Sequence, residues 1–152
     1  MTIPQWTLLG FTTWTLLLLM ATVGVYRWGN ILFAKAAIAS FRSDALEGAG
    51  WYQRGTRAHA NCIENLPVFG AIVVVISTIG LQGPMVDSLC IAILASRIVQ
   101  SCVHISHEQT NAFVAVRFSF YSVQLVSFLV LIVMASVQGQ MSAPSHSLNL
   151  TR

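Results

Sequence analysis

The chain has 152 residues, of which 55% are hydrophobic and only 9% are charged. Soluble globular domains carry about 25% charged residues, so this composition indicates an integral membrane protein. The formal net charge of +3 comes from few residues and forms no basic patch, which argues against a nucleic-acid-binding protein. We expect a single membrane domain.

Four apolar segments are each long enough to cross a hydrocarbon core of about 30 Å. Their expected ranges are about 5–27, 58–81, 85–106 and 111–137. Gly83 and Pro84 mark a helix stop and restart between the second and third segments, and Thr110 and Asn111 can cap the fourth. Residues 138–152 are polar without apolar periodicity and are expected to form a C-terminal tail. The sequence predicts an all-α bundle of four transmembrane helices.

Basic residues indicate how this bundle is oriented. Between the first and second segments lie Arg27, Lys35, Arg42, Arg54 and Arg57, whereas the turn between the second and third has no Lys or Arg. Short basic loops stay in the cytoplasm, so we expect the first loop to be cytoplasmic and both termini to lie on the opposite side.

Three of the expected helices carry a polar stripe in which residues three or four positions apart share a face. The stripes are Arg57, Asn61 and Glu64 on the second, Arg97, Gln100, Ser101 and His104 on the third, and Arg117, Tyr121 and Gln124 on the fourth. An ionisable residue inside a membrane helix costs about 2.5–3.5 kcal/mol on insertion scales, so each requires a partner or a function. The expected topology places all three stripes in the same half of the bilayer, where they can converge on one cleft. The polar content also favours a homo-oligomer.

A purely structural use of these groups is the simplest alternative. Glu64 would neutralise Arg97 or Arg117, while Asn61 and Gln100 would tie helices together. This use accounts for the carboxylate but leaves a surplus of stripe arginines, which indicates an anionic ligand.

A metal site is not expected. His104, His107 and Glu108 are spaced to share a helix face, but two histidines and an exposed carboxylate at a helix end make a poor metal site.

The run RAHANCIENLPVF, at residues 57–69, resembles the signature of the MAPEG family, the membrane-associated proteins of eicosanoid and glutathione metabolism that include microsomal glutathione transferases. Two later runs, RIVQSCVH at 97–104 and VRFSFY at 116–121, are similar to the third and fourth helices of that family. The resemblance implies a homotrimer of four-helix subunits, with glutathione bound between neighbours in the cytoplasmic half.

The resemblance also assigns residues to glutathione by motif position. Arg57, Asn61 and Glu64 would bind it, with Glu64 taking its amino end and the arginine its carboxylates, and Arg97 would give support from the third helix. Beside these, we assign Gln100 and His104 to the binding set because they share the stripe of Arg97.

Two residues of the fourth helix would act in catalysis. Arg117 matches the family arginine that faces the thiol, and Tyr121 follows it by one turn. A free thiol with a pKa near 8.5 is only a few per cent thiolate at neutral pH, and only the thiolate attacks electrophiles. Arg117 would stabilise the thiolate and Tyr121 would orient it. The implied activity is a glutathione transferase acting on lipophilic electrophiles, with peroxidase activity toward lipid hydroperoxides as an extension.

Two other functions stay open. Some relatives carry tyrosines where this chain has Asn65, Gln100 and His104, and some family members bind lipid without catalysis, so a non-catalytic lipid-binding trimer is one alternative. A small proton-coupled exporter is the other, with Glu64 exchanging a proton for a cation. The stripe arginines would repel such a cation.

Overall fold

The computed structural model describes residues 1–33, 48–106 and 110–142, and its regular structure there is entirely helical. The elements are α1 (Ile3–Leu18), η1 (Leu19–Gly24), α2 (Val25–Leu32), α3 (Gly50–Thr78), α4 (Pro84–Ser106) and α5 (Asn111–Ser142). Four helical runs in the described part are long and apolar enough to cross a membrane: Ile3–Leu32, Gly50–Thr78, Pro84–Ser106 and Asn111–Met141. The prediction of an all-α fold with four spans is confirmed.

The first span is longer than predicted and contains one irregular turn. Expected over about 5–27, it is helical from Ile3 to Leu32, with the π-helical segment η1 between α1 and α2. Thirty residues of helix measure about 45 Å, more than the hydrocarbon core, so this span extends beyond it. At η1, Thr22 packs so closely on α3 that a Cβ on Gly55 would lie 2.6 Å from the Thr22 Cβ.

Helix α3 begins at Gly50, about two turns before the predicted start at 58, because aromatic contacts hold its first turns against α2. Tyr52 stacks on Tyr26 with ring centroids 4.2 Å apart, and the Tyr52 hydroxyl accepts a hydrogen bond from Arg27 Nε at 3.0 Å. The helix ends at Thr78 rather than 81, because Gly80 adopts a φ of +67° and terminates it in a Schellman motif.

Helix α4 starts at Pro84 and ends at Ser106, within one residue of the prediction. Helix α5 starts as predicted at Asn111, where the Thr110 hydroxyl accepts a hydrogen bond from the Phe113 amide. It continues past the predicted end at 137 to Ser142, so part of the expected polar tail is helical. No proline interrupts α5 before Ser142.

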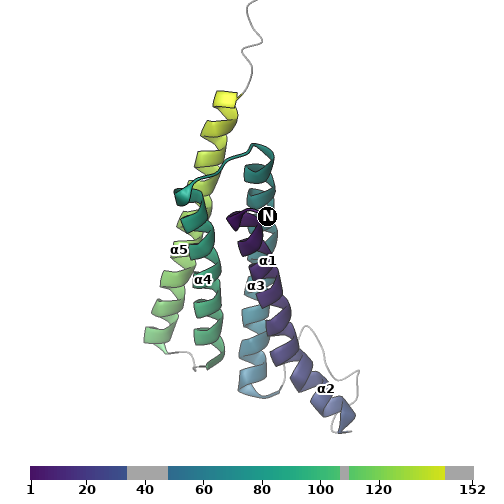
Figure 1. Cartoon of the computed structure of the whole chain (residues 1–152). Helices are drawn as coiled ribbons and strands as arrows, with labels where there is room; N and C mark the ends of the chain where they lie inside the picture. Colours follow the sequence, from purple (N-terminus) through teal and green to yellow (C-terminus); the bar gives the residue numbers. More distant parts are fainter. Residues whose placement is uncertain (34–47, 107–109, 143–152) are drawn as a thin grey trace, which may run out of the picture.

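The packing of these helices creates the space for a site. Helix α4 packs extensively against both α1 and α5, whereas α5 makes few direct contacts with α3. The core between them includes Phe11, Cys62, Phe69, Ile93 and Leu131, all fully buried. Helices α3 and α5 run in the same direction, opposite to α4 (Figure 1). The seam between α3 and α5 is therefore open at the surface and backed by α4.

The predicted sidedness depends partly on Lys35 and Arg42, which lie outside the described residues. Orientation in the bilayer thus stays a prediction.

Candidate functional site: a polar cleft between α3, α4 and α5

A cleft of about 470 Å³ opens between α3 and α5, near the end of the bundle where α4 ends and α5 begins. It is lined by Asn61, Glu64, Asn65, Arg97, Gln100, Val114, Arg117, Phe118 and Tyr121. The size falls within the range of about 300–1,000 Å³ that is usual for sites of small ligands. All three predicted polar stripes therefore contribute side chains to one cleft, which below is called the polar cleft.

Helix α3 supplies one wall of the polar cleft. Asn61, Glu64 and Asn65 are three and four residues apart, which places them on one face of the helix. Asn65 Nδ2 donates a hydrogen bond to the Asn61 carbonyl oxygen at 2.9 Å, whereas the carboxylate of Glu64 is exposed. This wall offers an amide and a carboxylate to a ligand.

Helix α4 supplies Arg97, which forms the back of the cleft and is only 1% exposed. Its guanidinium carbon lies 5.7 Å from the centre of the Phe11 ring on α1, close enough for a cation–π contact. Nε and Nη2 have no hydrogen-bond partner within the residues that the structure describes. A buried cation with unpaired donors is costly, so Arg97 favours an anionic ligand.

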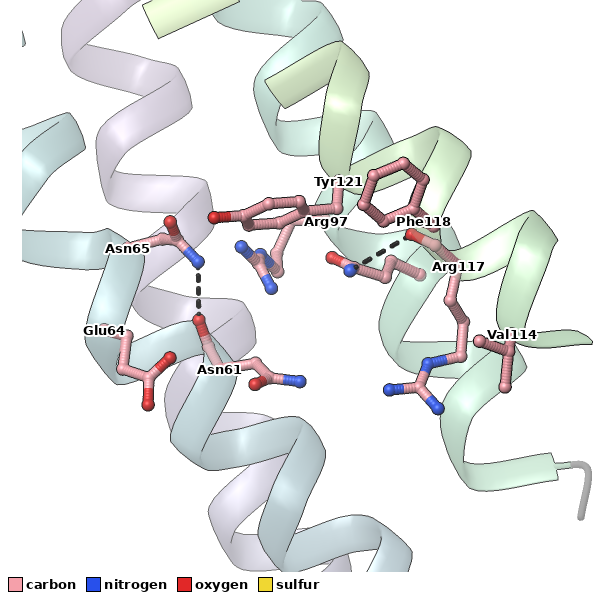
Figure 2. Close-up of a pocket in the computed structure, with 9 residues that line it drawn as sticks. Asn61, Glu64, Asn65, Arg97, Val114, Arg117, Phe118 and Tyr121 are labelled. Carbon is pink, nitrogen blue, oxygen red and sulfur yellow. Dashed lines mark hydrogen bonds between the residues drawn. The ribbon is translucent and has the colours of Figure 1, made fainter. Parts of the chain in front are cut away.

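Helix α5 supplies the opposite wall (Figure 2). Arg117 and Asn61 point toward each other across the cleft, and Tyr121 extends over it toward Asn65. Arg117 is partly buried, and its Nε also has no hydrogen-bond partner in the described part of the chain. Two arginines with unpaired donors and a single carboxylate, that of Glu64, thus line the cleft.

A pair of buried amides joins α4 to α5 behind this wall. Gln124, which is fully buried, donates from Nε2 to Gln100 Oε1 at 3.1 Å, and Gln100 Nε2 donates to the Arg117 carbonyl oxygen at 3.3 Å. The Gln100 amide therefore has a structural role. This role is the simplest alternative stated above, in which Gln100 ties helices together. These bonds fix the rotation of α5 that directs Arg117 into the cleft.

Two residues predicted for the binding set do not line the cleft. Arg57 is exposed one turn before Asn61, close enough to Arg117 for their like charges to repel. His104 is 4% exposed and lies outside the cleft, and neither ring nitrogen has a partner among the described residues. His107 and Glu108, considered above as metal ligands, lie outside the described residues.

Three lining residues were not in the predicted set: Asn65, Val114 and Phe118. Val114 and Phe118 lie seven and three residues before Tyr121, a spacing that places them on the same helix face, so the helical period could have identified them. Their apolar side chains border the charged groups, which would let an apolar ligand group lie beside a polar one.

The chain was also compared with known proteins. No curated protein and no solved structure matches it. The family model described as MAPEG family matches residues 6–137, which is most of the chain and includes every residue of the polar cleft. This protein therefore belongs to the MAPEG family.

Proposed function

We propose that this protein is a membrane-bound glutathione transferase, which joins the thiolate of glutathione to lipophilic electrophiles that arrive through the bilayer. Peroxidase activity toward lipid hydroperoxides would use the same thiolate. The observation that carries the proposal is the polar cleft, which is lined by Arg97 and Arg117 with unpaired guanidinium nitrogens and by the carboxylate residue Glu64. Glutathione has the complementary charges: two carboxylates, one amino group and a thiol.

Each wall of the cleft has a role in this proposal. Glu64 binds the amino group, Asn61 hydrogen-bonds the peptide, and Arg57, exposed one turn before Asn61, attracts a carboxylate. Arg97 contributes charge from the back of the cleft. Gln100 lines the cleft and stays in the proposed binding set, with both ends of its amide also hydrogen-bonded within the protein.

Arg117 and Tyr121 act on the sulfur. The guanidinium stabilises the thiolate, and the Tyr121 hydroxyl holds it by a hydrogen bond. The thiolate then attacks an electrophilic carbon, a carbon–sulfur bond forms, and the electron pair of the broken bond departs with the leaving group. The thiol proton goes to water. The proposal further includes a homotrimer whose polar clefts lie in the cytoplasmic half of the membrane.

Conjugation by protein reconstituted in liposomes tests this function. Purified protein, glutathione and chlorodinitrobenzene are mixed, and the absorbance of the conjugate is followed in wild type and in Arg117→Gln. We expect turnover that Arg117→Gln reduces by about 100-fold, in line with the loss of one stabilising charge. A wild type that binds glutathione but forms no conjugate would contradict the transferase.

The two other functions predict different results in the same liposomes. The missing tyrosines and the hydrogen-bonded Gln100 amide favour the non-catalytic lipid-binding protein, which would bind lipid but not glutathione. An exporter would show efflux of a lipophilic cation that Glu64→Gln abolishes. The arginines beside Glu64 disfavour it, since a cation entering the cleft would be repelled.

A further inference from the structure

Helix α2 carries an apolar face that points away from the bundle. Val25, Trp28 and Leu32 are 60%, 63% and 74% exposed, and their spacing of three and four residues places them on one side of the helix. Another side of α2 packs on the first turns of α3, where the Tyr26 ring stacks on Tyr52 with centroids 4.2 Å apart. Below, Val25, Trp28 and Leu32 are called the apolar face of α2.

The π-helical segment η1 sets the direction of this face. Its last hydrogen bond runs from the Val25 amide to the Met20 carbonyl oxygen, five residues earlier. Met20 is 67% exposed and lies on the outward side of the span. In an uninterrupted α-helix that side would continue through Arg27, seven residues after Met20. The extra residue of the π turn brings Val25 and Trp28 to the outward side instead. Arg27 is turned to α3, where its Nε donates to the Tyr52 hydroxyl at 3.0 Å.

The length of the span places the apolar face of α2 at the edge of the hydrocarbon core. Trp6, near the other end of the span, is also exposed, and it precedes Trp28 by 22 residues. This spacing corresponds to about 33 Å of helix, close to the core thickness of about 30 Å. Tryptophans concentrate at the two membrane interfaces. Leu32, about 6 Å beyond Trp28, then lies within a headgroup layer about 5–7 Å thick.

We propose that the apolar face of α2 docks into the lipid headgroup layer of the surrounding bilayer and anchors the bundle at that depth. Lipid is the occupant because this face continues the exposed side of a membrane span, so lipids that cover Met20 also reach Val25 and Trp28. The arrangement, with apolar side chains outward and Arg27 hydrogen-bonded to the protein, suits a lipid surface. It would be unfavourable for a helix surrounded by water.

The anchor also sets the depth of the polar cleft. Helix α2 is joined to α3 through Tyr52, and both lie at the end of the bundle where α3 begins (Figure 1). Asn61 of the cleft follows Tyr52 by nine residues, or about 14 Å of helix. The cleft is therefore held at a fixed distance from the headgroup layer. This anchoring is independent of the ligand that the cleft binds.

Spin labels on α2 test the docking. Val25→Cys, Trp28→Cys and Leu32→Cys are made singly in a Cys102→Ser background, because the other two cysteines are buried. The labelled protein is reconstituted in phosphatidylcholine liposomes. Electron paramagnetic resonance then measures collisions of the label with oxygen, which concentrates in lipid, and with a nickel chelate, which stays in water. We expect oxygen collisions to exceed nickel collisions at all three positions, with a depth that decreases by up to about 10 Å from residue 25 to residue 32.

Leu16→Cys, exposed near the middle of the same span, is the matched control and should report lipid whether or not α2 docks. If Trp28→Cys does not fold, Gly29→Cys follows Val25 by one turn at a position where a Cβ meets nothing within 4 Å. Nickel collisions that exceed oxygen collisions on α2 would overturn the proposal, because the helix would then project into water. Few collisions with either reagent, together with dipolar broadening between labels, would also overturn it, because a second copy of the chain would then cover the face.

Discussion

The most informative substitution is Arg117→Gln, which removes the charge proposed to stabilise the thiolate and leaves a shorter, neutral polar side chain. Arg117 is partly buried and has an unpaired Nε among the described residues. Two opposite charges about 4 Å apart gain about 4 kcal/mol at an effective dielectric constant of 20. Part of this gain offsets the desolvation of the thiolate. A net of about 2.7 kcal/mol lowers the pKa of the bound thiol by about two units.

The assay is a pH titration of glutathione bound to purified protein, followed by the ultraviolet absorbance of the thiolate. In wild type, a thiol pKa lowered from about 8.5 to about 6.5 gives roughly three quarters thiolate at pH 7. In Arg117→Gln the pKa should return toward its ordinary value, and the thiolate fraction at pH 7 should fall to about 3%. The fall occurs because the neutral amide no longer favours the charged form of the thiol.

Arg57→Gln provides the matched control. It removes the same charge from an exposed position that does not line the polar cleft. Because Arg57 is proposed to attract a carboxylate of glutathione, binding should weaken. Because Arg57 is not proposed to contact the sulfur, the pKa of the bound thiol should change little. The reasoning would be refuted if Arg117→Gln left the pKa of the bound thiol unchanged, or if both substitutions raised it equally.

Two further substitutions test the packing that holds the cleft in shape, both by titrating unfolding with sodium dodecyl sulfate. Gln124→Leu leaves Gln100 Oε1 without its donor and should lower the free energy of unfolding by about 1–2 kcal/mol. Ser127→Ala, one turn later, should lower it by less, because that hydroxyl bonds only its own helix; equal losses would contradict the amide pair. Gly55→Val should cost about 1–3 kcal/mol by overpacking against η1. Gly29→Val, where a Cβ meets nothing within 4 Å, should cost less, and the opposite ranking would refute the close contact.

The parts of the fold that depend on local pattern could be predicted from the sequence. Apolar length identified the four spans, because a hydrocarbon core accepts only a helix of sufficient length. Residues that typically start or cap helices identified the boundaries that depend on local sequence, such as Pro84 at the start of α4 and Thr110 at the cap of α5. One helix end that the prediction missed depends on distant contacts. The start of α3 at Gly50 depends on Tyr26 and Tyr52, which meet only after the chain has folded.

The candidate site divides in the same way. The helical period placed Asn61 and Glu64 on one face of α3, and the structure brings that face into the cleft with Arg97. The helical period does not determine which neighbouring helix packs against each turn of that face. His104 is buried outside the cleft, and Arg57 is exposed and does not line it.

Hydrogen-bond partners across helices also lie beyond sequence periodicity. The sequence placed Gln100 and Gln124 on polar stripes but could not show that their amides pair with each other. That pairing gives Gln100 a structural role as a support for Arg117, and its contact with a ligand stays a prediction. The excess of arginines over carboxylates on the polar stripes, in contrast, could be counted from the sequence. The structure is consistent with that excess, because Arg97 and Arg117 have donors without partners among the described residues.

The central claim, that the polar cleft binds glutathione, is tested most directly by isothermal titration calorimetry of the detergent-solubilised protein with glutathione. Wild type should show saturable binding, and Asn61→Leu, which removes one amide from the α3 wall, should weaken it about tenfold, equivalent to about 1.4 kcal/mol. Saturable binding that Asn61→Leu leaves unchanged would place glutathione elsewhere on the protein. Absence of saturable binding in wild type would contradict the account.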